Sequence, residues 1–325
     1  MTGRTLHSWK DDLLRNYPVR KTYAQKTAFI GHLAEIYGGR MHVEESGKLM
    51  KNRNIVIGNP DTASVVYGAH YDTCARLPFP NFITPKNFVI FFLYQIFVGL
   101  MMVVPVLLVT IPLAALFVWL GVPDGVDILL SELCLLAGVL GIYLLMTKGP
   151  ANRQNANDNT SGVVTVLTLA DRLTAAERED VCFVLFDNEE AGLFGSMAFA
   201  KAHKNVRDRT LLVNFDCVSD GDWLLLLASK PVQKKAAYGQ FCDHVRKTCA
   251  DTEKLPVFAA SMNTVYPSDQ MNFRKYIAAA ALKKTKTPLI GYYMDRIHTP
   301  KDTVFDERNI EVLAEIFADI GRFEL

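Results

Sequence analysis

The middle of this chain is an apolar block that few folds can accommodate. Residues 88–120 form a run of 33 positions without a formal charge, whereas a bilayer core about 30 Å thick needs roughly 20 apolar residues. A polar-leaning turn, 121–127, follows, and a second run of 19 residues, 128–146, carries only Glu132. A pair of buried core helices seldom sustains runs of this length. The sequence therefore predicts a transmembrane helical hairpin at 87–147, and Pro105 or Pro112 could kink its longer first helix.

Charges around the block predict its orientation. If the two flanks build one domain, the chain must return to its starting side, so it crosses the bilayer twice. The turn contains Asp124 and Asp127 but no basic residue, whereas four basic residues lie in the outer flanks: Arg76, Lys86, Lys148 and Arg153. Basic residues favour the cytoplasmic side of a membrane. We therefore expect an integral membrane protein with two spans and its folded domain in the cytoplasm.

Three further features narrow the partners and the compartment. The net charge is +1, and a nucleic-acid partner is not expected because phosphates require a basic surface. The six cysteines form no Cys-x-x-Cys pair, which fits a reducing compartment. The N-terminus has no apolar segment typical of a signal peptide, so the hairpin would direct the chain to the lipid bilayer.

Outside the block, helical patterns alternate with short apolar runs. The expected helices are 5–39, 162–173, 194–202, 232–248 and 306–323. The expected strands are 54–58, 63–70, 181–186, 211–215, 223–228, 277–282 and 289–293. Such alternation predicts an α/β fold, a three-layer α/β/α sandwich with a mixed, largely parallel central sheet. The domain would comprise residues 1–86 and 148–325, interrupted by the hairpin.

Five polar motifs follow strands or precede helices. They are Gly68-Ala-His70-Tyr-Asp72, Asn157-Asp158-Asn159-Thr-Ser-Gly162, Asp187-Asn-Glu189-Glu190, Asn214-Phe-Asp216 and His298-Thr-Pro-Lys-Asp302. Catalytic groups of open α/β sheets gather beyond the carboxyl ends of the strands. We therefore expect His70, the Glu189–Glu190 pair and Asp216 at one edge of the sheet.

Imidazole and carboxylate groups are ordinary zinc ligands, and a two-metal site needs a shared carboxylate with further ligands for each ion. Each motif alone is weak evidence. A His-x-Asp or a Glu-Glu pair is usually solvated, and Asp-Asn-x-Ser-Gly is most often a helix N-cap. The ordered conjunction of all five motifs is what indicates a metal site.

That conjunction resembles the co-catalytic zinc exopeptidases, a family that includes bacterial secreted aminopeptidases, with transferrin receptor and glutaminyl cyclase as divergent relatives. The resemblance covers residues 54–86 and 148–325. It implies two Zn²⁺ ions, one held by His70, Asp158 and Asp216 and the other by Asp158, Glu190 and His298. Glu189 would be the general base, and Asp72 would orient His70. Asp302 would support His298 or simply start the following turn.

The segment Tyr266-Pro-Ser-Asp269-Gln270-Met-Asn-Phe273 resembles the family's Ser-Asp-His-x-x-Phe segment beside the active site. It makes Tyr266, Asp269 and Gln270 the candidate substrate-binding residues. Gln270 stands where the family usually has His, and Tyr276-Ile-Ala replaces a common Gly-x-Pro. These departures leave the metal ligands intact and affect the part of the site that recognises the substrate.

The resemblance implies a membrane-anchored zinc metallopeptidase acting on peptides, including hydrophobic or membrane-derived ones. No arginine cluster suited to a substrate carboxylate lies near the motifs, which favours an aminopeptidase over a carboxypeptidase or dipeptidase. Two alternatives remain open. One is a glutaminyl-cyclase-like transferase that uses one zinc, and the other is a non-catalytic membrane receptor or scaffold that keeps the fold.

Overall fold

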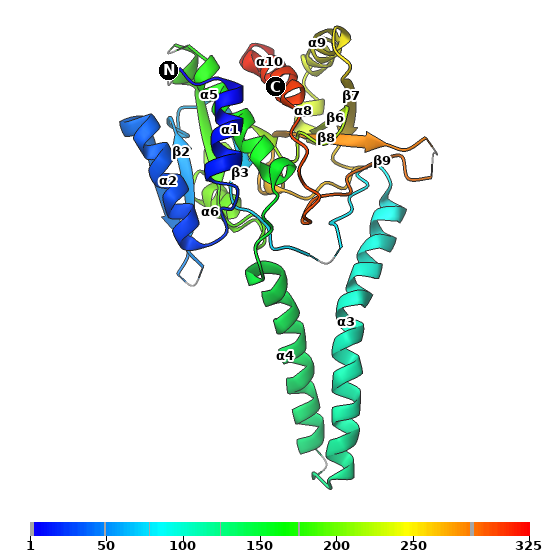
Figure 1. Cartoon of the computed structure of the whole chain (residues 1–325). Helices are drawn as coiled ribbons and strands as arrows, with labels where there is room; N and C mark the ends of the chain where they lie inside the picture. The colour runs from blue at the N-terminus through cyan, green and yellow to red at the C-terminus, as the bar shows by residue number, and fades with distance from the viewer. Residues whose placement is uncertain (1–2, 49, 78, 124, 175, 287–288) are drawn as a thin grey trace.

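A mixed β-sheet forms the centre of the folded domain, and two long helices project from it (Figure 1). The computed structural model describes residues 3–325 except 49, 78, 124, 175 and 287–288; Asp124 of the predicted turn therefore lies outside the described residues. The strands are β1 (Met41–Ser46), β2 (Asn52–Ile57), β3 (Val65–His70), β4 (Val181–Phe186), β5 (Leu211–Phe215), β6 (Trp223–Ala228), β7 (Leu255–Ala260), β8 (Tyr276–Lys284) and β9 (Tyr292–Tyr293).

Strand order confirms the predicted fold class. The order is β1-β2-β4-β3-β5-β8-β6-β7, with β9 paired to β8. The four central strands β4, β3, β5 and β8 run parallel, while β1, β2 and β6 pair antiparallel with a neighbour. The carboxyl ends of β3, β4 and β5 therefore meet at one edge, as the motifs predicted.

Alternating side chains of the strands pack on the two faces of the sheet. One face carries α1 (Leu6–Asn16), α2 (Tyr23–Tyr37), α5 (Gly162–Arg172), α9 (Tyr238–Ala250) and α10 (Glu307–Ala318). On the other face, α6 (Phe194–Ala202) and α7 (Lys204–Asp208) cover one half. Irregular segments that include Ile83 and Met294 cover the rest. Each fully buried large apolar side chain contributes roughly 1.5–3 kcal/mol to folding, so these faces supply most of the stability of the domain.

Several predicted boundaries are wrong. The helix expected at 5–39 is two helices, because Pro18 lies in the break between α1 and α2. The helix expected at 232–248 is divided into α8 (Lys230–Gln233) and α9, and the strand expected at 289–293 is only β9. Two strands, β1 and β7, were not predicted. Both lie at an edge of the sheet, where polar side chains and Pro256 are tolerated.

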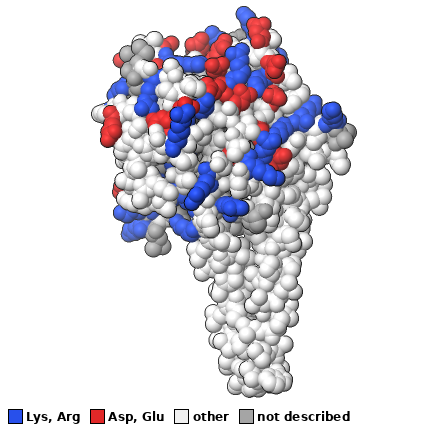
Figure 2. Space-filling model, in the orientation of Figure 1, with Lys and Arg blue, Asp and Glu red and all other residues white. Residues whose placement is uncertain are grey.

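The two long helices are α3 (Phe88–Trp119) and α4 (Val126–Lys148), which matches the predicted apolar runs. Both are long and apolar enough to cross a membrane, and almost none of their surface is buried inside the protein. On the face drawn in Figure 2, charged side chains of both signs cover the domain, whereas the projecting hairpin carries none. Pro105 and Pro112 lie within α3, which continues through both.

Candidate active site

The five predicted motifs converge at the carboxyl edge of the parallel strands. His70 is the last residue of β3, Asp216 follows β5 directly, and Glu189 and Glu190 lie just beyond β4. Asp158 lies in an irregular turn, Ala156–Ser161, which precedes α5. From His70 the chain runs through a short loop into α3, so this edge of the sheet faces the hairpin (Figure 1).

Asp158 lies between the two histidines of the site. Its Oδ1 is 3.3 Å from His70 Nε2, and its Oδ2 is 3.1 Å from His298 Nε2. Asp216 Oδ1 lies 3.4 Å from His70 Nε2, and Glu190 Oε2 lies 3.3 Å from His298 Nε2. Each oxygen of one carboxylate thus belongs to a separate group of candidate ligands, the arrangement that a shared ligand of two metal ions requires.

Unpaired buried oxygens show that these residues fit metal ions. Among the described residues, Glu190 Oε1 and Asp216 Oδ1 are buried without a hydrogen-bond donor. Buried carboxylates are normally paired or bind a metal. Ligand atoms of His70, Asp158 and Asp216 lie within 4.8 Å of one another, as do those of Asp158, Glu190, His298 and Cys74. Histidine and carboxylate donors suit zinc, so the donor set fits the metal that the sequence predicted.

Two carboxylates hold the backbone of the candidate ligands. Asp72 Oδ1 accepts a hydrogen bond from Glu189 N at 3.0 Å, and its Oδ2 accepts one from Glu190 N at 3.3 Å. It also lies 3.6 Å from His70 Nδ1. Asp302 accepts hydrogen bonds from the backbone amides of Asn157 and Asp158 at 2.8 and 2.9 Å. Asp302 therefore contacts the Asp158 turn, not the His298 side chain that the sequence suggested as its partner.

Sequence reasoning missed the asparagines on either side of Asp158. Asn157 Oδ1 accepts hydrogen bonds from Ser219 N and Asp220 N at 2.7 and 3.0 Å. Asn159 Oδ1 accepts one from Cys217 N, and its Nδ2 donates to Phe215 O. Both amides join the Asp158 turn to the segment that carries Asp216. The Asn-Asp-Asn sequence was the available signal, and it was interpreted as a helix cap.

Lys26 and Arg20 were also missed, because they lie far away in sequence. Lys26 Nζ makes a buried ion pair with Asp187 and donates to Asn188 Oδ1 at 2.7 Å, just before the glutamate pair. Arg20 is fully buried and donates to Tyr71 O at 2.6 Å and to Thr160 Oγ1 at 3.2 Å. The N-terminal helical segment thus supports both sides of the site.

Crowded carboxylates dominate the electrostatics. Burial, together with the charges of Glu190, Asp269 and Asp216, raises the pKa of Glu189 well above its usual value. Burial also raises the pKa of Glu190, with Asp158 the next largest cause. Burial opposes ionisation of Asp158 too, but hydrogen bonds from His298 and His70 hold its pKa below the usual range. Bound cations reverse such shifts by favouring the ionised carboxylates.

The three candidate substrate-binding residues have different surroundings. The side chain of Gln270 is engaged internally, because its Oε1 accepts from Asn214 at 2.9 Å and its Nε2 donates to Tyr266 O at 2.7 Å. The Tyr266 hydroxyl donates to Asp216 O at 2.9 Å. Asp269 is fully buried, and neither of its carboxylate oxygens accepts a hydrogen bond from a described residue. Of the three, Asp269 has free hydrogen-bonding capacity.

The family model for peptidase family M28 matches residues 145–320, more than half of the chain. The protein belongs to peptidase family M28. The matched segment contains Asp158, Glu189, Glu190, Asp216 and His298, whereas His70 and Asp72 precede the hairpin and lie outside it. Membership implies a zinc-dependent, peptidase-type hydrolase. A search of curated proteins finds no match.

Solved structures of the same fold support the family assignment. A Zn-dependent exopeptidase from Parabacteroides distasonis is 12% identical, with a TM-score of 0.56 over 97% of this chain and 96% of that one. Glutaminyl cyclase from Porphyromonas gingivalis is 14% identical, with a TM-score of 0.56 over 98% and 96%. The LapA aminopeptidase of Legionella pneumophila is 11% identical, with a TM-score of 0.50 over 96% and 66%. At these identities the likeness shows the M28 fold alone.

Proposed function

We propose that this M28 protein is a membrane-anchored aminopeptidase with two zinc ions. Residues 1–86 and 148–325 would form the peptidase domain, and residues 87–147 a hairpin that crosses the bilayer twice. The carrying observation is the position of Asp158, whose two oxygens lie 3.3 and 3.1 Å from the two histidines. His70 and Asp216 would complete one zinc site, and Glu190 and His298 the other.

Each residue has a distinct role in peptide hydrolysis. Bound zinc supplies Lewis-acid chemistry, which polarises a carbonyl and lowers the pKa of water. Glu189 takes the proton of the attacking water on its carboxylate and returns it to the leaving amine. Asp72 keeps Glu189 and His70 in position through the backbone amide and the imidazole Nδ1. Tyr266 fixes Asp216 through its backbone oxygen.

Asp269 supports recognition of the amino end of a peptide. It is buried, has no donor among the described residues, and lies close enough to Glu189 for its charge to raise the pKa of that residue. Burial raises the pKa of Asp269 to about 7. An ammonium group nearby favours the ionised form of a carboxylate, so a peptide α-amino group is the complement that this site accepts.

The attachment of the hairpin supports hydrophobic substrates. It leaves the domain 17 residues after His70 and returns 11 residues before Asp158, so the site faces the membrane side of the domain. The basic flanks favour a cytoplasmic domain. Peptides released within or at the bilayer would therefore reach the site without crossing bulk water.

The first test uses detergent-purified protein with Glu189→Gln and Glu190→Gln. We expect Glu189→Gln to keep two zinc ions per chain and to lower the rate by roughly 10²–10⁴. Glu190→Gln should lose zinc. Zinc is measured by mass spectrometry of the metal, and activity on peptides with free or blocked amino ends.

Three results would contradict the proposal. Zinc loss in Glu189→Gln but not in Glu190→Gln would reverse the two roles. Cleavage that ignores a blocked amino end would exclude an aminopeptidase. Ring closure of amino-terminal glutamine without release of a residue would indicate a cyclase.

A further inference from the structure

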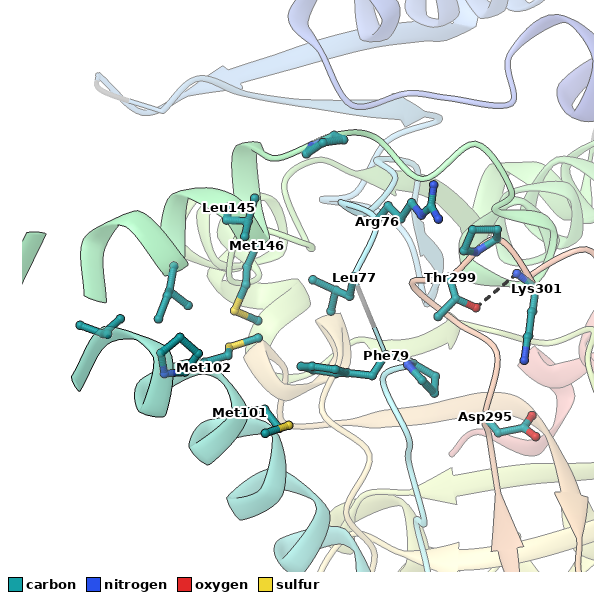
Figure 3. Close-up of a pocket in the computed structure, with 16 residues that line it drawn as sticks. Arg76, Leu77, Phe79, Met101, Met102, Leu145, Met146, Asp295, Thr299 and Lys301 are labelled. Carbon is teal, nitrogen blue, oxygen red and sulfur yellow. Dashed lines mark hydrogen bonds between the residues drawn. The ribbon is translucent and has the colours of Figure 1, made fainter. Parts of the chain in front are cut away.

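A cleft separates the two hairpin helices where they meet the domain. Its volume is about 980 Å³, at the upper end of the roughly 300–1,000 Å³ that small-molecule sites occupy. Its helical walls carry apolar side chains, namely Met101, Met102 and Pro105 of α3 and Ile142, Leu145 and Met146 of α4. Figure 3 shows these methionines opposite a polar side, where Arg76, Thr299 and Lys301 lie.

The helices approach closely on the far side of this cleft. A Cβ atom on Gly138 would lie only 2.4 Å from Val106 Cγ1, so α3 and α4 are in contact one turn beyond Pro105. Toward the domain they diverge (Figure 1). The cleft is therefore closed toward the tip of the hairpin, and its polar side belongs to the domain.

Helix geometry places the cleft at a membrane boundary. From Trp119 to Met101 the α3 axis rises about 27 Å, close to the roughly 30 Å of a hydrocarbon core. An aromatic cluster surrounds the next turns of α3. Phe97 contacts Phe79 edge-on, and Tyr94 packs against Phe82 and donates to Pro80 O. Aromatic side chains gather at the headgroup level of bilayers, so the polar side of the cleft lies at that level.

Two cations on the polar side have no partner of opposite charge. Among the described residues, neither the Arg76 guanidinium nor the Lys301 ammonium makes an ion pair, whereas Asp295 is paired with Lys283 at 2.5 Å. The cleft thus combines an apolar chamber with an excess of positive charge at its headgroup end. The chemistry complementary to both is an anionic amphiphile.

We propose that the cleft binds one anionic phospholipid of the bilayer, with an acyl chain between α3 and α4 and its phosphate on Arg76 and Lys301. This inference rests on the proposed membrane hairpin but not on the peptidase chemistry. The lipid would contact the segment that carries a candidate zinc ligand, because Leu77 N donates to His298 O at 2.9 Å and Thr299 lines the cleft.

The test is photo-crosslinking of the full chain in phosphatidylcholine vesicles. A minor lipid with a diazirine in its acyl chain is either phosphatidylglycerol or phosphatidylcholine, and labelled peptides are identified by mass spectrometry. We expect phosphatidylglycerol to label residues 101–106 and 142–146 at least about tenfold more, because each basic residue near the surface favours anionic lipid by about fivefold. Arg76→Gln with Lys301→Gln should abolish this preference.

The matched control is Lys86→Gln with Lys148→Gln, which removes two exposed charges from the helix roots outside the cleft. The control should keep the preference. Equal labelling by both lipids, equal loss in the control, or displacement by inorganic phosphate or an apolar peptide would overturn the lipid site. Labelling of the exposed Leu108 and Leu136 reports membrane insertion separately. If they are labelled and the cleft is not, only this inference fails, and Glu189→Gln protein gives the same readout without activity.

Discussion

Asn159 does what a carboxylate in its place could not. Its amide oxygen accepts from Gly162 N at 3.0 Å while its amide nitrogen donates to Phe215 O at 3.0 Å. A carboxylate only accepts hydrogen bonds. This joins the Asp158 turn to the end of β5 at a distance that leaves little room. A Cβ on Gly162 would lie 2.3 Å from Phe215 O and from Asn159 Oδ1, so the closeness depends on a residue without a side chain.

Gly162→Ala should therefore separate the two halves of the site. We expect it to lower the free energy of unfolding by about 1–3 kcal/mol, as other overpacked positions do, and to weaken zinc binding. The control is Gly31→Ala in α2, where a Cβ meets open space; there alanine should stabilise by up to about 1 kcal/mol. Thermal unfolding and zinc content of both variants are the measurements. Equal stability of the two variants would contradict the close approach.

At the scale of elements, α2 positions the glutamate pair from across the sequence. Its Lys26 pairs with Asp187, and Asp187 Oδ2 also accepts from Arg53 N in β2 at 2.9 Å. Asn188, the next residue, has a left-handed backbone with φ 53°, a conformation that asparagine adopts more readily than most residues. Helix α2, strand β2 and the turn after β4 thus form one hydrogen-bonded unit ahead of Glu189.

Lys26→Met tests this unit. Removing one partner of a buried ion pair costs about 3–5 kcal/mol because the other charge stays buried, so we expect a large loss of stability. We also expect a lower kcat, since the turn before Glu189 loses a contact. Lys201→Met in the exposed part of α6 is the control and should change neither quantity. Unchanged activity at full zinc occupancy in Lys26→Met would limit α2 to a structural role.

Periodicity predicted the central strands well because they are buried on both faces. The runs at 181–186, 211–215 and 223–228 match β4, β5 and β6 residue for residue. The edge strands gave no such signal, since Met41–Ser46 is largely polar and Pro256 interrupts the other. The contacts of Arg20, Lys26 and the two asparagines were also unpredictable, because they depend on segments that approach only after folding.

At the scale of the whole molecule, domain and hairpin are joined at several points. Lys21 Nζ donates to Thr147 O at 2.5 Å in the last turn of α4, and Asn87 Nδ2 donates to Leu289 O at 2.7 Å where α3 begins. Ala75 pairs with Ala151 in an isolated bridge. These contacts fix the direction in which the helices leave the domain, so the orientation of the site relative to a membrane would be fixed as well.

Cysteine accessibility tests the proposed topology. With Cys134 replaced by Ser, the remaining native cysteines are buried. Pro123→Cys in the turn should then react with an impermeant thiol reagent in intact cells. Lys204→Cys, exposed on the domain, should react only after permeabilisation. The opposite pattern would place the domain outside the cytoplasm, and extraction of the chain at alkaline pH would argue against membrane insertion.

Replacement of residues 87–147 by a flexible Gly/Ser linker tests the function of the hairpin. We expect hydrolysis of apolar, bilayer-partitioned peptides to fall well below that of short polar peptides, because the membrane would no longer deliver them. Both rates are compared with those of the full chain in vesicles. Equal retention of the two activities would show that the hairpin only attaches the enzyme to the membrane.

The position of the hairpin in the chain also dictates an order of biosynthesis. Strand β3 pairs only with β4 and β5 in the described sheet, and both are translated after α4. When the ribosome has made His70 and Asp72, every other candidate zinc ligand is still unsynthesised, and the hairpin emerges before any of them. The nascent protein therefore has no complete catalytic centre while it is being delivered. Proteolytic competence arises only after the hairpin has left the ribosome, which protects the cytoplasm from an enzyme that has not yet reached its membrane.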